Sequence, residues 1–144
     1  MIVLDVNVLV AAYLTGHDFH AAANKFLNET LNTSEVAVPD VVWSGFVRTV
    51  TNPVLAQPPA TWPEVRAFVA AVQQYPGYRA DVRCLAAALD SFLALCQTTD
   101  ARRNKVSDAY IAAIAIAHNA SVATWDTDFD AFPVTVIHPP LKTA

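Results

Sequence analysis

The sequence of 144 residues has little glycine, cysteine or charge. It contains only 3 glycines and 2 cysteines, and charged residues make up 15% of the chain. Two cysteines are too few for a disulfide framework. If Cys84 and Cys96 lie on one helix, about 18 Å of axial rise separates them, which exceeds disulfide reach. We therefore expect free thiols in a reducing cytoplasm.

Long apolar runs are also absent. The longest candidate, Ala109 to Ala117, falls well short of the roughly 18 apolar residues that a spanning helix needs. The N-terminus has no basic region, and Asp5 interrupts its apolar stretch, which argues against a secretory signal. The sequence therefore predicts no membrane segment and no export.

Apolar residues, in contrast, are abundant. They make up 54% of the chain, and the mean hydropathy is +0.32. This exceeds the average for soluble domains and predicts a well-filled core together with an apolar surface for a partner. The net charge of −4 argues against a typical nucleic-acid binder. It does not exclude one, because an acidic pocket that binds cations contributes negative charge.

Short apolar runs alternate with helical patterns along the whole chain, which favours an α/β fold with a mostly parallel sheet covered by helices. We expect one domain over residues 1–140 and a short tail over 141–144. The predicted strands cover residues 2–4, 35–38, 122–124 and 134–137. The predicted helices cover residues 8–14, 18–30, 40–50, 62–72, 82–96 and 108–118.

Capping residues predict where several of these helices begin. Thr61 and Glu64 have the spacing of a capping box at the start of the fourth helix. Asp18, Asp40 and Ser107 are expected to cap the second, third and last helices.

Four aspartates far apart in the chain stand where a predicted strand ends or a helix begins: Asp5, Asp108, Asp126 and Asp128. In open α/β sheets, ligands bind outside the carboxyl ends of the strands. Carboxylates gathered there repel one another unless a cation lies among them, and oxygen ligands favour Mg²⁺ or Mn²⁺. The pattern predicts a metal-dependent enzyme acting on phosphodiesters. The alternatives are a favourable charge at a helix N-terminus for Asp108 and turn hydrogen bonds for Asp126 and Asp128.

Four sequence motifs, in this order along the chain, resemble the signature of PIN domains, and more narrowly the VapC-type ribonuclease toxins of bacterial toxin–antitoxin pairs. They are Ile-Val-Leu-Asp-Val-Asn-Val-Leu at 2–9, Phe-Val-Arg-Thr-Val-Thr-Asn-Pro at 46–53, Val-Ser-Asp-Ala-Tyr-Ile-Ala-Ala at 106–113 and Ala-Thr-Trp-Asp-Thr-Asp-Phe at 123–129. The resemblance covers essentially the whole chain. It implies a PIN-like fold and a Mg²⁺- or Mn²⁺-dependent endoribonuclease in the bacterial cytoplasm. It also implies cleavage of structured tRNA or rRNA to 5′-phosphate and 3′-hydroxyl ends.

The resemblance also implies roles for individual residues and for partners. Asp5, Asp108 and Asp126 would be the catalytic metal ligands. Supporting roles would fall to Asp128, Asn7 and Thr124. Arg48 is a further supporting candidate, which is expected either to contact phosphate or to pair with an acidic residue near the pocket. A homodimer is expected, together with a VapB-like antitoxin whose C-terminal arm covers the acidic pocket.

One position departs from the family pattern. The family usually has a glutamate just before the motif at 46–53, where this chain has Gly45. Asp40 lies five residues earlier, about 140° round the helix, and does not replace it. We therefore expect that the site holds one ion instead of two, with water in the missing place. The alternatives are that the protein is weakly active, or that it is a non-catalytic PIN-like module that binds RNA or protein. The last of the candidate functions is a phosphatase with Asp5 as nucleophile. Such enzymes usually have a second aspartate two residues after the nucleophile, where this chain has Asn7.

Other candidate residues carry weaker signals. His17, Asp18 and His20 have a spacing that suits a metal, but scattered histidines more often lie on surfaces. Trp125, next to the acidic pair, is the best candidate for stacking on a base. The basic cluster over residues 102–105 is expected at the pocket rim, where it would meet phosphates, or as a solvated loop.

Overall fold

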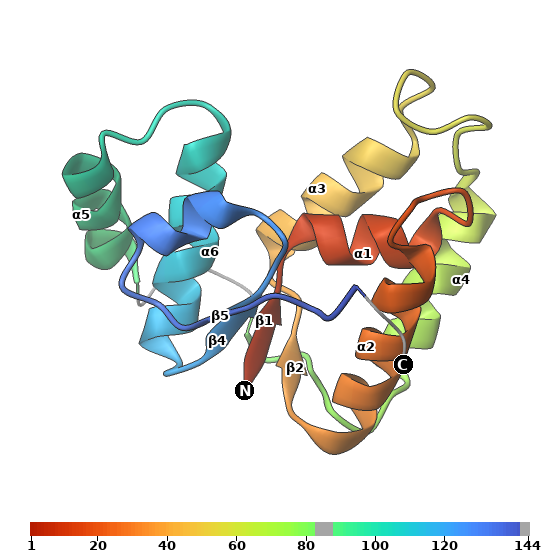
Figure 1. Cartoon of the computed structure of the whole chain (residues 1–144), viewed down its shortest axis with the longest axis horizontal. Coiled ribbons are helices and arrows are strands. Elements are labelled where there is room, and N and C mark those ends of the chain that lie inside the picture. Colours follow the sequence, from red (N-terminus) through yellow and green to blue (C-terminus); the bar gives the residue numbers. More distant parts are fainter. Residues whose placement is uncertain (83–87, 142–144) are drawn as a thin grey trace.

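The computed structural model describes residues 1–82 and 88–141 and contains a five-stranded sheet between two groups of helices (Figure 1). The strands pair in the order β3-β2-β1-β4-β5, and every pairing is parallel. Their bounds are β1 (Ile2–Leu4), β2 (Val36–Ala37), β3 (Tyr78–Arg79), β4 (Ser121–Ala123) and β5 (Val136–Ile137). The predicted α/β fold with a parallel sheet is confirmed, but β3 was not predicted.

The central strand is apolar because both of its faces are covered. Val3 and Leu4 of β1 are fully buried, as are Val36 of β2 and Val122 of β4 on either side. A continuous aliphatic run is what a buried parallel strand requires.

The helices fall into two groups in Figure 1, with α1 to α4 on the right of the sheet and α5 and α6 on the left. Their bounds are α1 (Val6–Tyr13), α2 (His20–Thr33), α3 (Asp40–Val50), α4 (Trp62–Gln73), α5 (Leu89–Thr99), α6 (Asn104–Ala117) and the 3₁₀ helix η1 (Thr127–Ala131). Among the residues that the structure describes, no helix combines the length and apolar character needed to cross a bilayer.

The predicted capping box is confirmed, but the single caps are wrong. The Thr61 side chain accepts from the Glu64 N–H, and the Glu64 side chain accepts from the Thr61 N–H. Asp18 does not cap α2, which begins after Phe19. Asp40 is already helical and occupies the first turn of α3, where its charge favours the helix N-terminus.

Helices α5 and α6 also begin elsewhere than predicted. The predicted helix over 82–96 is observed only from Leu89, and residues 83–87, including Cys84, lie outside the described residues. Helix α6 begins at Asn104, so Ser107 lies within its first turn instead of capping it. The chain turns sharply before α6, since Asp100 and Arg103 both have positive φ angles.

The strand order creates a crevice beside β1. From β1 the chain first builds β2 and β3 on one side and later β4 and β5 on the other. The connections above β1 and β4 therefore diverge, which is where open α/β sheets bind ligands. Asp5 directly follows β1 and Thr124 directly follows β4, so both stand at this switch point.

Candidate active site

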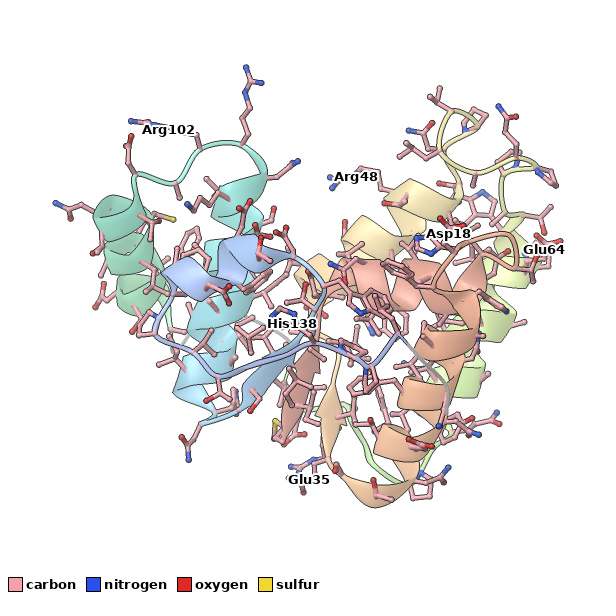
Figure 2. All side chains as sticks on the ribbon, in the orientation of Figure 1. Asp18, Glu35, Arg48, Glu64, Arg102 and His138 are labelled. Atoms are coloured by element: carbon pink, nitrogen blue, oxygen red, sulfur yellow. The ribbon has the colours of Figure 1, made fainter. Side chains whose placement is uncertain are left out.

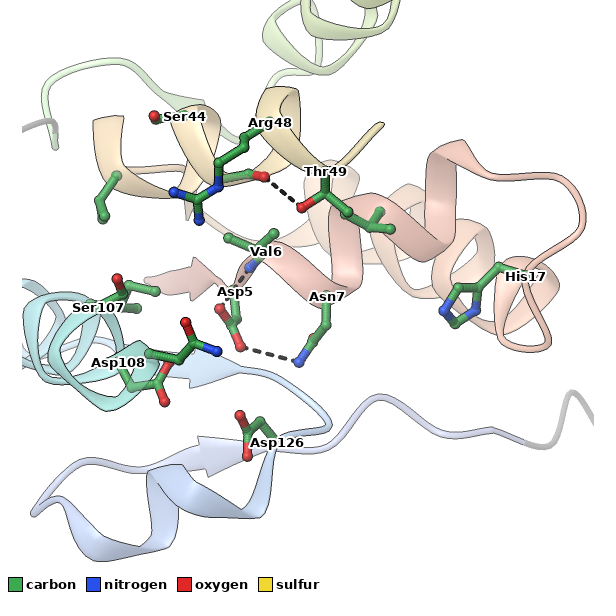
Figure 3. A pocket seen from close by; sticks show the side chains of 15 residues that line it. Asp5, Val6, Asn7, His17, Ser44, Arg48, Thr49, Ser107, Asp108 and Asp126 are labelled. Carbon is green, nitrogen blue, oxygen red and sulfur yellow. Dashed lines mark hydrogen bonds between the residues drawn. The ribbon is translucent and has the colours of Figure 1, made fainter. Parts of the chain in front are cut away.

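A cavity of about 410 Å³ lies over the carboxyl ends of β1 and β4, between α3 and α6 (Figure 3). Three of the predicted aspartates line it, each from a different part of the chain. Asp5 comes from the end of β1, Asp108 from the second turn of α6, and Asp126 from the segment after β4. The predicted convergence of remote carboxylates at this edge of the sheet is therefore present.

Asp5 is held by the fold itself. Its Oδ1 accepts from the Val6 N–H at 2.7 Å, and its Oδ2 accepts from the Thr124 hydroxyl at 2.7 Å and the Asn7 amide at 3.1 Å. Burial raises the pKa of Asp5, the hydrogen bonds from Thr124 and Val6 oppose that rise, and the charge of Asp126 adds to it. A carboxylate accepts about four hydrogen bonds, so these three leave room for one cation on Oδ1.

Thr124 and Asn7 are hydrogen-bonded to the acidic residues. Thr124 is fully buried, and its hydroxyl donates to Asp5 while accepting from the Asn7 amide at 2.9 Å and the Asp126 N–H at 2.9 Å. Its one donor and two acceptor positions are therefore all used. The Trp125 N–H in turn donates to the Asn7 Oδ1 at 3.5 Å. This partly buried network links the ends of β1 and β4 and fixes the positions of Asp5 and Asp126.

Asp108, Asp126 and Asp128 form a tighter group. One carboxylate oxygen from each lies within 4.8 Å of the other two, which suits a single cation. The Asp126 Oδ1 also accepts from the Asp128 N–H at 2.9 Å, so the turn chemistry considered as an alternative is present as well. The donor set consists of oxygens alone, which fits a hard ion such as Mg²⁺ or Mn²⁺. Asp128, predicted as a supporting residue, belongs to this group, although it is exposed and does not line the cavity.

Asp108 has the most perturbed carboxyl of the site. Burial is the main cause that raises its pKa to about 7. The negative charges of Asp5, Asp126 and Asp128 act in the same direction, and the charge of Lys105 opposes them. Like charges this close favour protonation of one of them, and a bound cation would relieve the repulsion.

The opposite wall of the cavity comes from α3 and carries no carboxylate. Ser44, Gly45, Arg48 and Thr49 line it, and the exposed Asp40 does not, as the helical angle predicted. A Cβ atom at Gly45 would lie 2.7 Å from a methyl group of Val6, closer than real contacts allow. The missing glutamate is therefore accompanied by a close packing of α3 on α1.

One residue at the rim, Ser44, was missed in the sequence. It lies four residues before Arg48 on the same helix, so the helical period could have identified it as a neighbour of the site. Asn104, which belongs to the cluster over residues 102–105 that was expected at the rim, also lines the cavity.

The weaker candidates make contacts within the protein. His17 lines the cavity, but its Nδ1 accepts from the Phe19 N–H at 3.0 Å, and the His20 Nδ1 lies 2.9 Å from the Ala11 carbonyl oxygen. Among the described residues, no metal-binding group includes either histidine. The Trp125 indole packs against Phe19 and donates to a backbone carbonyl at 2.8 Å, which indicates a structural role.

Comparisons with known proteins agree with this architecture. The profile of the PIN domain family matches residues 2–134. Ribonuclease VapC31 of Mycobacterium tuberculosis is 34% identical over 143 residues, covering 98% of this chain and 100% of the relative. Ribonuclease VapC25 of the same organism is 32% identical with the same coverage.

Solved structures with low sequence identity share the fold. A chain in the crystal structure of VapBC2 from Rickettsia felis, bound to a promoter DNA fragment, superposes with a TM-score of 0.66 at 17% identity, covering 95% of this chain and 98% of that one. A chain of FitAcB from Neisseria gonorrhoeae gives a TM-score of 0.61 at 21% identity, covering 96% and 98%. The chain therefore belongs to the PIN-domain family and, within it, to the group of the VapC ribonucleases.

Proposed function

We propose that this protein is a metal-dependent endoribonuclease toxin of the VapC type. The observation that carries the proposal is the convergence of Asp108, Asp126 and Asp128 within 4.8 Å, beside Asp5, at the switch point of a PIN-type sheet. Relatives at 32–34% identity over 98% of the chain are named as ribonucleases, which supports RNA as the substrate.

The reaction is hydrolysis of an RNA phosphodiester. The oxygen of a water molecule attacks phosphorus, the bond from phosphorus to O3′ breaks, and one proton of the water ends on O3′. The products are a 3′-hydroxyl and a 5′-phosphate. A divalent ion held by these carboxylates would bind a phosphate oxygen and lower the pKa of a bound water. Asn7 and Thr124 keep Asp5 and Asp126 in position through the hydrogen bonds described above.

A protein partner belongs to the same proposal. The structural neighbours include VapBC and FitAB assemblies bound to DNA, which supports a cognate antitoxin for this chain. An arginine on the arm of such an antitoxin would pair with the acidic side of the cavity. Exposed apolar side chains, such as Val54, Leu55 and Trp62, support further contacts with an antitoxin or a second copy of the chain.

The alternative function is a non-catalytic module that binds RNA or protein. The absence of a carboxylate at Gly45 favours it, because one ligand of the usual family pattern is missing.

The test is cleavage of structured RNA by the purified chain with Mn²⁺ and with EDTA. We expect cleavage only with Mn²⁺, and a loss of about 100-fold or more in Asp5→Asn and Asp108→Asn. Asp90→Asn, an exposed change on α5, is the matched control and should cleave normally. RNA binding without cleavage by the unmodified chain would support the non-catalytic module instead.

A further inference from the structure

The contact between Gly45 and Val6 closes one side of the cavity to a longer side chain. A Cβ at position 45 would lie 2.7 Å from one methyl group of Val6 and 3.6 Å from the other. Val6 cannot easily turn away, because its β-branched side chain is stiff within a helix. Its backbone is also fixed, since its N–H donates to Asp5. The α3 wall therefore cannot supply a carboxylate at this position without a change in α1.

The remaining polar groups on that wall are poor ligands for a second cation. The Thr49 hydroxyl donates to the Gly45 carbonyl at 2.8 Å, and Ser44 offers only a neutral hydroxyl at the exposed rim. The carboxylates all lie on the far side, from β1, α6 and the segment after β4. Protein sites for Mg²⁺ are usually built on carboxylates, so the cavity has ligands for one ion on one side only.

Arg48 occupies the side that lacks carboxylates. It follows Gly45 by three residues on α3, lines the cavity, and directs its guanidinium inward in Figure 3. It carries the only positive charge of a lysine or arginine among the described lining residues. Across residues 1–82 and 88–141, its guanidinium has no ion pair or hydrogen bond, although three aspartates line the same cavity. Its planar donors are free and suit two oxygens of a phosphate.

We propose that this cavity holds a single divalent ion and that Arg48, in the place of a second ion, contacts a non-bridging oxygen of the scissile phosphate. The inference rests on the proposed ribonuclease function. The phosphate would lie between the ion on the aspartate side and the guanidinium on the α3 side. Arg48 would then stabilise the negative charge that develops on the phosphate oxygens during hydrolysis.

The first experiment counts Mn²⁺ by isothermal titration calorimetry and by electron paramagnetic resonance. We expect one tight ion per unmodified chain. The double variant Val6→Ala/Gly45→Glu removes the clash, because the nearest remaining atom, the Cβ of residue 6, lies 3.8 Å from the new Cβ. This variant should bind a second Mn²⁺. Val6→Ala/Gly45→Gln has the same shape without the charge and should still bind one.

The second experiment tests Arg48 directly. Arg48→Ala should bind Mn²⁺ as the unmodified chain does but cleave RNA about 100-fold more slowly, and added guanidinium ion should restore part of the rate. Arg48→Lys should keep an intermediate rate, since a lysine retains the charge but not the paired donors. Arg66→Ala, on the exposed face of α4, is the control for loss of one positive charge and should behave normally.

The outcomes separate this inference from the proposed function. Two tight ions in the unmodified chain, or full cleavage by Arg48→Ala, would overturn the inference and leave the ribonuclease function standing. An unmodified chain that binds one ion and cleaves no RNA would contradict the function. In that case weaker RNA binding by Arg48→Ala would still support its phosphate contact, and unchanged binding would overturn it.

Discussion

At the scale of single residues, the two central carboxylates differ in how the fold holds them. Asp5 accepts three hydrogen bonds and caps α1, so it has a structural role as well as a proposed catalytic one. Asp108 has no hydrogen bond or ion pair within residues 1–82 and 88–141, although it is half-buried. A partly buried carboxylate without a partner is costly and typical of functional sites.

The raised pKa of Asp108 predicts how stability changes with pH when metal is absent. Its pKa is 3.8 in an exposed reference and about 7 in the folded chain. Between these values the folded state holds more protons than the unfolded state, so stability falls as pH rises through this window. In EDTA, we expect the Tm to be several degrees lower at pH 7.5 than at pH 5. Asp108→Asn should reduce this fall, as measured by thermal melts followed by circular dichroism.

The control for this pH dependence is Asp90→Asn, which removes an exposed aspartate outside the cavity. Between pH 5 and pH 7.5, the Tm of this variant should fall as much as the Tm of the unmodified chain. If the Tm of Asp108→Asn also fell by the same amount, Asp108 would not be the group that causes the pH dependence.

The sequence predicted that remote aspartates meet at one edge of the sheet, but it did not predict all the contacts among them. The aspartates were predictable because each follows a strand or lies near a helix start. The approach of Asp128 to Asp108 and Asp126 was not predictable, because it depends on how η1 packs against α6. The missing glutamate at Gly45 was visible in the sequence. Its contact with Val6 was not, because two separate helices make it.

At the scale of elements, the sequence correctly predicted a helix start where two side chains form specific hydrogen bonds with the backbone. The capping box at the start of α4 was predicted from Thr61 and Glu64 alone. Strand β3 was missed because it has only two residues, Tyr78 and Arg79, and lies at the sheet edge without an apolar run. The start of α6 was misplaced because Ser107 is a good cap by type. The turn that begins this helix instead depends on the positive φ of Arg103.

The capping box gives a test of helix stability away from the site. Thr61→Ala removes the hydroxyl that accepts from the Glu64 N–H. Loss of such a cap costs about 1 kcal/mol, measured as the free energy of unfolding in urea. RNA cleavage should not change, since no residue of α4 lines the cavity. Thr61→Ser keeps the hydroxyl and should retain most of the stability, and equal losses in both variants would contradict a capping role.

At the scale of the whole molecule, topology explains why an acidic protein can act on an anionic polymer. The strand order places Asp5 and Thr124 side by side at the switch point, and α6 brings Asp108 to the same edge. The net charge of −4 therefore includes a local cluster whose repulsion a cation can remove. Within the part of the chain that the structure describes, Arg48 is the one lysine or arginine that lines the cavity. It is free, whereas Lys105 acts on Asp108 and Arg102 is paired with Asp100 at 2.8 Å.

This charge distribution predicts a shallow salt dependence of RNA binding. With two or three phosphate contacts, the slope of log K against log salt should be about −2 or shallower, since each contact contributes about −0.7 for a single strand. The measurement is fluorescence anisotropy of a labelled single-stranded RNA with the Asp5→Asn protein at fixed Mn²⁺ and increasing KCl. Adding Arg48→Ala should make the slope shallower by about 0.7, whereas adding Arg66→Ala should leave the slope unchanged. A slope steeper than about −4 would require more than five phosphate contacts. The RNA would then have to follow a basic surface elsewhere on the molecule instead of entering the cavity beside Arg48.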